Sequence, residues 1–321
     1  MDEKLISVAM CTYNGGKYLK EQLDSIINQT YKNIEIIICD DGSTDNTIDI
    51  IKNYSKKYNF IKLFQNETNL GFVKNFEKSI SLCKGDYIAL ADQDDIWKVN
   101  KLEVFLCEIG DNLLIYSDAI IMDGEGTISN NELIRPKGNL VKGRCNKAFL
   151  FTNCVSGNTL MFKKELIKDI VPIPEKITYH DIWIAFVASS LGTITFTQEA
   201  LTYYRRYAEQ ITSTREKNYK SFIDRFQTKK ASNLKSAKDI IDNLSIFETL
   251  EYLDKDIKLI IKESLIHFNN FSNSYFNYKL FKILKKYKDE VFAIKKDKKR
   301  LKYIRRISYG LKAHIISLFT I

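Results

Sequence analysis

Four short apolar runs alternate with amphipathic segments in the first 91 residues, and this alternation constrains the fold most strongly. The runs cover residues 5–10, 34–39, 61–65 and 87–91. The segments between them, such as 18–29, repeat apolar residues at helical spacing. Strands that are apolar on both faces need helices on both sides, so the pattern predicts an α/β fold with a mostly parallel sheet flanked by helices.

Two further local features are expected. Ser43 or Thr44 should cap the helix that contains Ile48, Ile51 and Tyr54. Residues 155–162 form an apolar run that is typical of a strand, after a polar, loop-rich segment at about 124–147.

Polar residues follow three of the apolar runs at the point where each strand should end. These clusters are residues 12–14, 40–43 and 92–95. Ligands of parallel α/β sheets gather at the carboxyl ends of the strands, so the three clusters should lie together and bind a ligand.

The acidic cluster, in the stretch GDYIALADQDDIW, contains Asp92, Asp94 and Asp95. Carboxylates so close repel one another, and a cation relieves that repulsion. Oxygen ligands suit Mg²⁺ or Mn²⁺, and Mg²⁺ typically takes one or two carboxylates together with substrate phosphates. The alternative is a solvated acidic turn, and the spacing does not match a calcium-binding loop.

Several nucleotide-binding and phosphate-transferring folds share this layout without matching its details. The glycine patterns of dinucleotide-binding and P-loop proteins are missing after the first run. A haloacid-dehalogenase-type phosphatase would use Asp92 as nucleophile and Asp94 as acid, but its motif normally has Thr or Val where this chain has Ile96. A sugar-phosphate nucleotidyltransferase would carry a Gly-rich basic loop after the first strand.

An ordered set of motifs over about residues 5–215 resembles the inverting glycosyltransferases of family 2, which adopt the GT-A fold. The motifs are VAMCTYNGGKYL, IIICDDGSTDNT, NLGFVKNF, GDYIALADQDDIW, SGNTLMF and YHDIW. The forms DQDD-x-W and HD-x-W look most like the bacterial branch that transfers rhamnose and related sugars onto surface polysaccharides.

The resemblance implies a nucleotide-diphosphate sugar donor, a glycan or lipid-linked acceptor, and a divalent metal, Mg²⁺ or Mn²⁺. Asp94 would coordinate the metal that bridges the donor diphosphate, and Asp92 would touch the ribose. The full set of residues implied to bind the nucleotide sugar is Thr12, Tyr13, Asn14, Asp40, Asp41, Asp92 and Asp94. A turn with a helix cap is the structural alternative for Asp40 and Asp41.

Asp181 matches the position of the general base in the family. A carboxylate there would take the proton of the acceptor hydroxyl as the new bond forms, and a single displacement inverts the anomeric carbon. The alternative is that Asp181 only caps a helix.

Further contacts to the diphosphate or the acceptor are expected from Asp95, Gly157, His180, Trp183 and Arg205. Gly157 would leave room for a sugar to approach the backbone. Trp183 packs either against the acceptor site or in the core. The family often has a metal-reaching His two residues after the Arg of its Y-R motif, whereas this chain has Tyr207. The alternative function is therefore that of a catalytically degenerate protein of the same fold, which only binds a nucleotide sugar or serves as a scaffold.

Charge divides the chain near residue 210. Residues 201–321 carry 27 Lys and Arg against 13 Asp and Glu, whereas residues 1–200 carry 22 against 27. We expect a catalytic domain at 1–215 and a basic helical region at 216–321. The helical stripe Leu301, Ile304, Ile307, Leu311, Ile315 and Leu318 either packs on the catalytic domain or lies on an anionic membrane surface.

Location and other partners follow from motifs that the sequence lacks. No nucleic-acid recognition motif accompanies the basic charge, so no nucleic-acid partner is expected. The six cysteines contain no C-x-x-C pair, and no secretory signal or long apolar run is seen. We expect a cytoplasmic protein with reduced thiols. If the helical stripe lies on a membrane, the protein would be peripheral on the inner face of the cell membrane.

Overall fold

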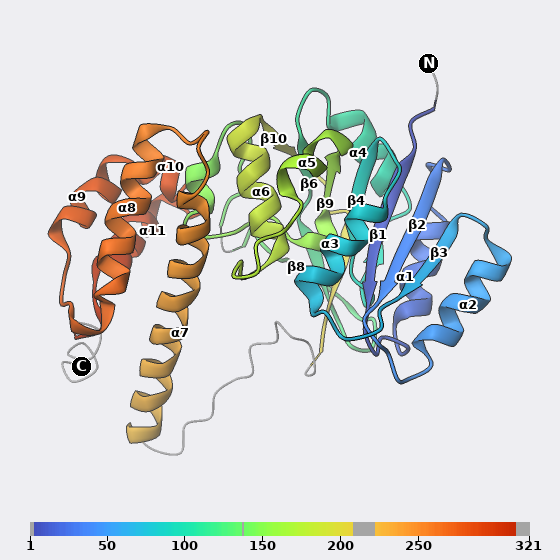
Figure 1. The fold of residues 1–321 in the computed structure, drawn as a ribbon, viewed down its shortest axis with the longest axis horizontal. Coiled ribbons are helices and arrows are strands. Elements are labelled where there is room, and N and C mark those ends of the chain that lie inside the picture. The colour runs from blue at the N-terminus through green and yellow to red at the C-terminus, as the bar shows by residue number, and fades with distance from the viewer. Residues whose placement is uncertain (1–2, 137, 208–221, 313–321) are drawn as a thin grey trace. The chain divides into compact units, whose positions relative to one another are not determined.

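The computed structural model describes residues 3–136, 138–207 and 222–312, which form two compact units (Figure 1). The first unit comprises residues 1–144, 154–175 and 179–211, and the second comprises 145–153, 176–178 and 212–321. Two short segments of the N-terminal part of the chain therefore belong to the second unit.

A seven-stranded sheet with the order β10-β6-β9-β4-β1-β2-β3 forms the centre of the first unit. Its strands are β1 (Ile6–Thr12), β2 (Ile34–Asp40), β3 (Ile61–Gln65), β4 (Tyr87–Ala91), β6 (Leu114–Tyr116), β9 (Leu160–Lys163) and β10 (Ile194–Phe196). Among these described strands, only β9 runs antiparallel to its neighbours. The predicted fold, a mostly parallel sheet flanked by helices, is confirmed.

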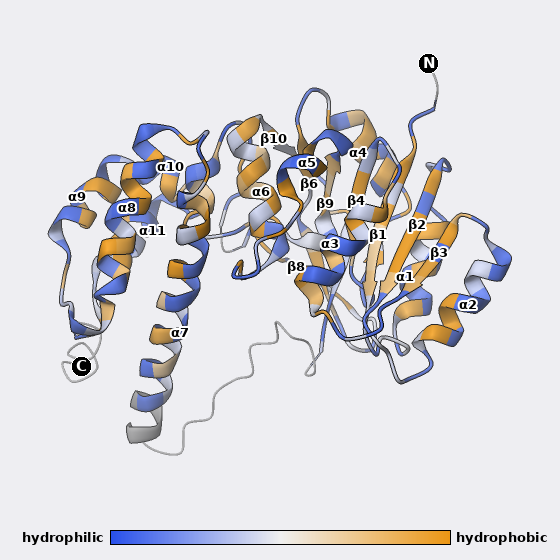
Figure 2. Cartoon of the chain, in the orientation of Figure 1, coloured by the Kyte–Doolittle hydropathy of each residue, from blue (hydrophilic) through white to orange (hydrophobic). Residues whose placement is uncertain are grey.

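Helices cover both faces of this sheet because its central strands are apolar on both sides (Figure 2). Apolar side chains of α1 (Leu19–Ile27), α2 (Thr47–Lys57) and α4 (Lys101–Glu108) share one core with alternate residues of β1 and β2. Helix α3 (Phe72–Leu82) packs on the opposite face, where Asn75 donates to the carbonyl of Cys39 at 2.8 Å. The remaining helical elements of this unit are η2 (Gly157–Thr159), η3 (Lys164–Leu166), α5 (Ile167–Ile170) and α6 (His180–Leu191).

A smaller sheet with the order β5-β11-β7-β8 lies in the same unit. Its strands are β5 (Ile96–Trp97), β7 (Ala119–Asp123), β8 (Ile128–Glu132) and β11 (Thr202–Arg206). Because β5 directly follows the acidic cluster and pairs with β11, residues near 205 are brought beside Asp94 and Asp95.

Two local predictions were wrong. Helix α2 begins at Thr47, with Asn46 as its N-cap residue, because the Ser43 hydroxyl donates to Asp40 at 2.6 Å. The apolar run at 155–162 starts as the short turn η2, and only its end forms strand β9. Thr159 bonds back to the Ser156 carbonyl through both its backbone and its hydroxyl, which favours a turn at that point.

The second unit is helical. Its elements are η1 (Asn146–Phe149), α7 (Phe222–Glu248), α8 (Lys255–Asn269), η4 (Phe271–Asn273), α9 (Tyr278–Lys286), α10 (Lys288–Val291) and α11 (Asp297–Ser308). No helix in the described ranges is long and apolar enough to cross a membrane.

The predicted apolar stripe of the basic region is used in part to build this unit. Ile304 is fully buried, and Ile307 and Leu311 join a cluster with Ala237 and Phe268. Leu301, by contrast, is 42% exposed. The last two residues of the stripe, at 315 and 318, lie outside the described residues.

We predict that Ile304→Ala destabilises the helical unit by about 2–5 kcal/mol, because it leaves a cavity where a buried side chain was. Leu301→Ala on the same helix should cost about 1 kcal/mol or less, since that side chain is largely solvated. Hydrogen exchange of the α11 amides in the full chain would measure both changes separately from unfolding of the first unit. Equal effects of the two substitutions would contradict the packing of the stripe.

Candidate active site

The three polar clusters converge at the carboxyl edge of the central sheet. Strands β4, β1 and β2 are adjacent, with Thr12 opposite Asp40 and Met10 opposite Ala91. Thr12 and Asp40 end their strands, and Asp92 follows β4 directly. The register therefore brings polar groups from distant parts of the chain to one edge, as the sequence predicts.

Asp40 shapes this edge. Its carboxylate accepts hydrogen bonds from the hydroxyls of Thr12 at 2.8 Å and Ser43 at 2.6 Å, and from the amides of Gly42 and Ser43. The side chain is buried. Four donors fill most of its acceptor positions, so the geometry matches the structural alternative of a turn.

Asp41 joins β2 to the loop before α3. Its carboxylate accepts from the side chain of Asn66 at 2.8 Å and from the amides of Leu70 and Gly71 at 2.7 and 2.9 Å. Asp41 is also buried. The binding of a nucleobase or ribose by Asp40 and Asp41 stays a prediction, and both side chains clearly also order the surrounding loops.

Tyr13 and Asn14 follow β1 and differ in their surroundings. The Tyr13 side chain is 51% exposed, while its backbone exchanges two hydrogen bonds with the side-chain amide of Gln93. Asn14 adopts a φ of 47°, and its side-chain oxygen accepts from the Thr44 amide at 2.8 Å. Tyr13 thus presents a ring to solvent beside the acidic cluster, whereas Asn14 closes the turn by capping the neighbouring loop.

The acidic cluster carries strongly perturbed carboxyl groups. Desolvation raises the pKa of Asp92 to about 7, with the charges of Asp94 and Asp181 adding to the shift and Lys101 opposing it. Burial also raises the pKa of Asp95 well above its usual range, and the charges of Asp94 and Asp92 raise it further. Because the charge of Asp181 acts on Asp92, the predicted base lies within electrostatic range of the acidic cluster.

Asp95 is held inside the protein, and its predicted contact with a diphosphate or an acceptor stays a prediction. It is fully buried, accepts the backbone amide of Arg205 at 2.9 Å, and accepts a hydrogen bond from the Asn158 side chain. These bonds tie the acidic cluster to β11 and to the turn η2.

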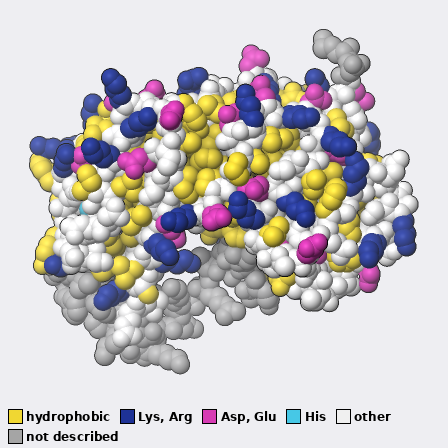
Figure 3. All heavy atoms as spheres, in the orientation of Figure 1, with side chains coloured by type: hydrophobic (Ala, Val, Ile, Leu, Met, Phe, Trp, Pro, Cys, Tyr) yellow, Lys and Arg dark blue, Asp and Glu magenta, His cyan; other side chains and the backbone are white. Residues whose placement is uncertain are grey.

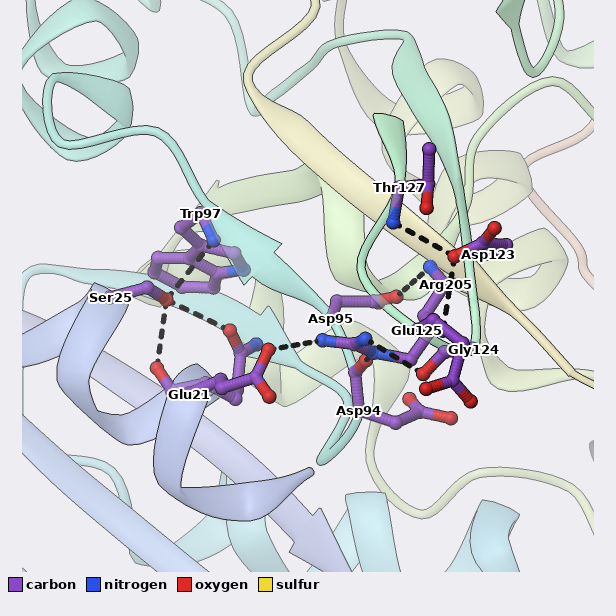
Figure 4. Close-up of polar contacts among 11 residues, drawn as sticks. Glu21, Ser25, Asp94, Asp95, Trp97, Asp123, Gly124, Glu125, Thr127 and Arg205 are labelled. Carbon is purple, nitrogen blue, oxygen red and sulfur yellow. Dashed lines mark hydrogen bonds and ion pairs between the residues drawn. The ribbon is translucent and has the colours of Figure 1, made fainter. Parts of the chain in front are cut away.

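Arg205 forms a clamp on the acidic cluster (Figure 4). Its guanidinium donates to the carbonyl of Asp94 at 2.8 Å and to the carboxylate of Glu21 at 2.6 Å, and it lies 4.4 Å above the Tyr18 ring. The side chain is only 1% exposed. Contact between Arg205 and a diphosphate stays a prediction, and it would compete with these interactions.

Tyr207 occupies the position where the family resemblance would place a histidine. Its hydroxyl donates to Oδ2 of Asp94 at 2.6 Å, and its ring lies 5.0 Å from that of Tyr18. Burial, reinforced by Asp94, raises the pKa of Tyr207, so the phenol remains a proton donor. Tyr207 therefore fixes the orientation of Asp94.

Lys101 is a charged residue of the site that the sequence analysis missed. It is fully buried at the start of α4, where its ammonium donates to the Asn158 carbonyl at 2.6 Å and lies 3.6 Å above the Trp97 ring. Burial lowers its pKa well below the usual range, while the charges of Asp95 and Asp92 act in the opposite direction. No motif distinguishes this lysine from its many solvated neighbours in the sequence.

His180 and Asp181 begin helix α6. Asp181 is partly exposed and accepts the Ile182 amide at 2.6 Å, so it also contributes to the helix N-terminus. His180 is buried against the ring of Phe76 at 4.1 Å, and burial lowers its pKa to about 3. The neutral imidazole packs directly over Gly157, where a Cβ atom would lie 2.7 Å from Nε2. The room predicted over Gly157 is therefore filled by His180.

Trp183 belongs to the core. Its side chain is 4% exposed, and its indole N–H donates to the Ile170 carbonyl at 2.9 Å. Of the two alternatives for Trp183, the geometry favours packing in the core.

A metal ion at this site would need some of its ligands from the bound substrate. Within the described residues, no group of three or more His, Cys, Asp or Glu side chains is arranged to hold a metal ion. The mutual repulsion of Asp92, Asp94 and Asp181 nevertheless favours a cation, and a diphosphate would supply the remaining oxygen ligands. The residues thus fit a divalent ion that binds together with a phosphorylated ligand.

Comparisons with known proteins identify the family and the fold of this chain. An uncharacterized glycosyltransferase of Haemophilus influenzae is 30% identical, with 95% of this chain and 98% of the relative covered. S. aureus TarS 1-349 in complex with UDP-GlcNAc shares the fold, with a TM-score of 0.60 and 21% identity over 99% of this chain and 91% of that chain.

A mannosyltransferase of Pyrobaculum calidifontis in complex with GDP-Man and Mn²⁺ also shares the fold. Its TM-score is 0.56 at 14% identity, over 83% of this chain and 69% of that chain. The family described as glycosyl transferase family 2 matches residues 7–170, about half of the sequence. This chain belongs to glycosyl transferase family 2.

Proposed function

We propose that this glycosyltransferase moves a sugar, such as rhamnose, from a nucleotide-diphosphate donor to a glycan or lipid-linked acceptor in cell-surface polysaccharide synthesis. One observation carries the proposal. The charges of Asp94 and Asp181 both act on Asp92, at the sheet edge that also holds Thr12 and Tyr13. A nucleotide diphosphate needs this combination of polar and aromatic groups, and sugar transfer needs a nearby base.

The residues would divide the work as follows. The exposed ring of Tyr13 covers the nucleobase, and Asp92 binds the ribose. Asp94, oriented by Tyr207, would hold the Mg²⁺ or Mn²⁺ ion that binds with the donor. The bound ion would stabilise the charge that develops on the leaving diphosphate.

Asp181 takes the proton of the acceptor hydroxyl while that oxygen attacks the anomeric carbon, so the reaction inverts the configuration. No protein nucleophile is needed, because the acceptor oxygen itself displaces the diphosphate. The basic helical unit would attach the protein to the inner face of the cell membrane, where lipid-linked acceptors are found.

Asp94→Asn should weaken metal-supported donor binding by more than about 10-fold. Loss of a residue that only orients a metal ligand typically costs at least about that much, and loss of the ligand itself should cost more. The amide keeps the shape of the carboxylate but loses its charge. Calorimetric titration with UDP and with GDP, each with and without Mn²⁺, measures the effect. Asp111→Asn, at an exposed position, is the matched control. Unchanged Mn²⁺-dependent affinity in the Asp94 variant would reject the metal assignment.

Tyr207→Phe should reduce the same Mn²⁺-dependent affinity by about 10-fold, because Asp94 loses the hydrogen bond that orients it. Tyr203→Phe, in strand β11, removes a hydroxyl as well and serves as the control. If both phenylalanine variants bind nucleotide and Mn²⁺ as the unmodified protein does, Tyr207 has no role in the metal site.

Asp181→Asn should lower turnover by about 100-fold or more while donor affinity stays nearly the same. A panel of nucleotide sugars, screened by thermal stabilisation, identifies the donor, and release of nucleotide diphosphate then reports transfer. Glu175→Gln, at an exposed position in the same segment, controls for charge. Persistent turnover would make Asp181 structural. A protein that binds donors but turns none over, even unmodified, would be the nucleotide-sugar-binding alternative.

A further inference from the structure

The basic helical unit exposes a group of aromatic side chains that its core does not use. Tyr275, Phe276, Tyr278 and Tyr309 are 56%, 39%, 61% and 38% exposed, and Phe281 beside them is partly exposed. We call these five residues the aromatic patch. Large exposed apolar groups that gather in one place commonly mark an interaction site.

The backbone holds the aromatic patch together across two segments. Phe276 and Tyr309 form an antiparallel bridge, and the Gly310 amide donates to the Tyr275 carbonyl at 2.8 Å. Gly310 is required by this close approach, because a Cβ atom there would lie 2.1 Å from the Ser274 carbonyl oxygen. The loop before α9 and the end of α11 therefore form one ordered surface.

The rings also contact one another. Phe276 lies 5.5 Å from Phe281 and 5.2 Å from Tyr309, and Tyr278 stacks at 6.4 Å on Phe281. Such distances are typical of attractive aromatic pairs. The aromatic patch is thus a preformed surface, which lowers the entropy lost when it binds a partner.

Positive charge surrounds the aromatic patch. Lys282 lies 4.6 Å above the Tyr278 ring, and Lys312 lies 5.3 Å above the Tyr275 ring. Residues 274–312 contain 14 Lys and Arg but only 3 Asp and Glu. Figure 3 shows Lys and Arg side chains spread over the helical unit on the face that it draws.

The three acidic residues of this segment are already paired. Arg300 bonds Asp289 at 2.6 Å and Asp297 at 2.9 Å, and Glu290 pairs with Lys147. These ion pairs leave the acidic groups little capacity to neutralise the lysines around the aromatic patch. The surface therefore favours a negatively charged partner.

We propose that the aromatic patch docks on an anionic lipid surface, with Tyr275 and Tyr278 at the level of the headgroups and Lys282 and Lys312 on their phosphates. Tyrosine is enriched at membrane interfaces because its ring is apolar and its hydroxyl is polar. Carbohydrate would stack on free ring faces, but lysines lie over Tyr275 and Tyr278. This inference deepens the membrane attachment proposed above by naming its contact face. It differs from the predicted stripe, in which Ile304 and Leu311 are buried.

Tryptophan fluorescence can test the contact face in the full chain. Trp97 and Trp183 are 2% and 4% exposed, so their emission should respond little to added vesicles. A Tyr278→Trp variant should shift its emission to the blue with vesicles of phosphatidylcholine and phosphatidylglycerol, and brominated lipid should quench it. Tyr252→Trp, which replaces a 43% exposed tyrosine of the same unit outside the aromatic patch, should show neither change.

Vesicle partitioning gives an independent measurement. Lys282→Gln and Lys312→Gln should each lower the partition coefficient about fivefold, which corresponds to about 1 kcal/mol per charge. The double change Tyr275→Ser and Tyr278→Ser should lower it further, while Tyr252→Ser should not. Binding should also weaken with added salt and be much lower on pure phosphatidylcholine.

The outcomes separate this inference from the proposals on which it rests. Strong vesicle binding with equal responses at positions 278 and 252 would overturn the aromatic patch while keeping membrane attachment. Two results would overturn both the aromatic patch and the membrane attachment. One is no binding to anionic vesicles, and the other is a Tyr278→Trp variant that responds to oligosaccharide but not to vesicles. Donor binding measured by calorimetry should be unchanged in all these variants. A variant that binds the donor normally but no longer binds vesicles has therefore lost docking alone.

Discussion

Electrostatic repulsion among carboxylates at the sheet edge is the constraint on which the rest of the site depends. Asp181 lies far along the chain from Asp92 and Asp94, yet its charge and that of Asp94 add to the desolvation that raises the pKa of Asp92 to about 7. Such a group is unfavourable unless nearby cations or hydrogen bonds offset it. Much of the surrounding structure serves to hold these charges in place.

Two buried basic residues support the acidic cluster in different ways. The charge of Lys101, from α4, opposes the rise in the pKa of Asp92, whereas Arg205, from β11, donates to the Asp94 carbonyl and pairs with Glu21 of α1. Neither cation is exposed, so both cost free energy to bury and both depend on complete hydrogen bonding. Tyr207 then orients Asp94 by donating a hydrogen bond to one of its oxygens. The central sheet, the small sheet and α1 are thereby coupled at the site.

The parts of this protein that follow from local pattern were predictable. Apolar runs bounded by polar turns predicted the four N-terminal strands, since burial on both faces leaves a strong signal. Local competition for hydrogen bonds was harder to foresee. Ser43 could cap a helix or bond Asp40, and only the positions of Thr12, at the end of β1, and of Asn14, just after it, favour the second choice. The turn at Gly157 likewise reflects its contact with His180.

The sequence by itself determined the parallel sheet, the edge at which polar groups meet, and the acidic residues Asp92 and Asp94 that follow its fourth strand. These depend on periodicity and on strand ends, which are local properties. Tertiary structure alone decided that Lys101 is buried, that Asp95 faces inward, that Arg205 clamps the cluster, and that Ile304 packs in the helical core. Burial and charge pairing join residues far apart in the chain, and their energies depend on distances that no local pattern encodes.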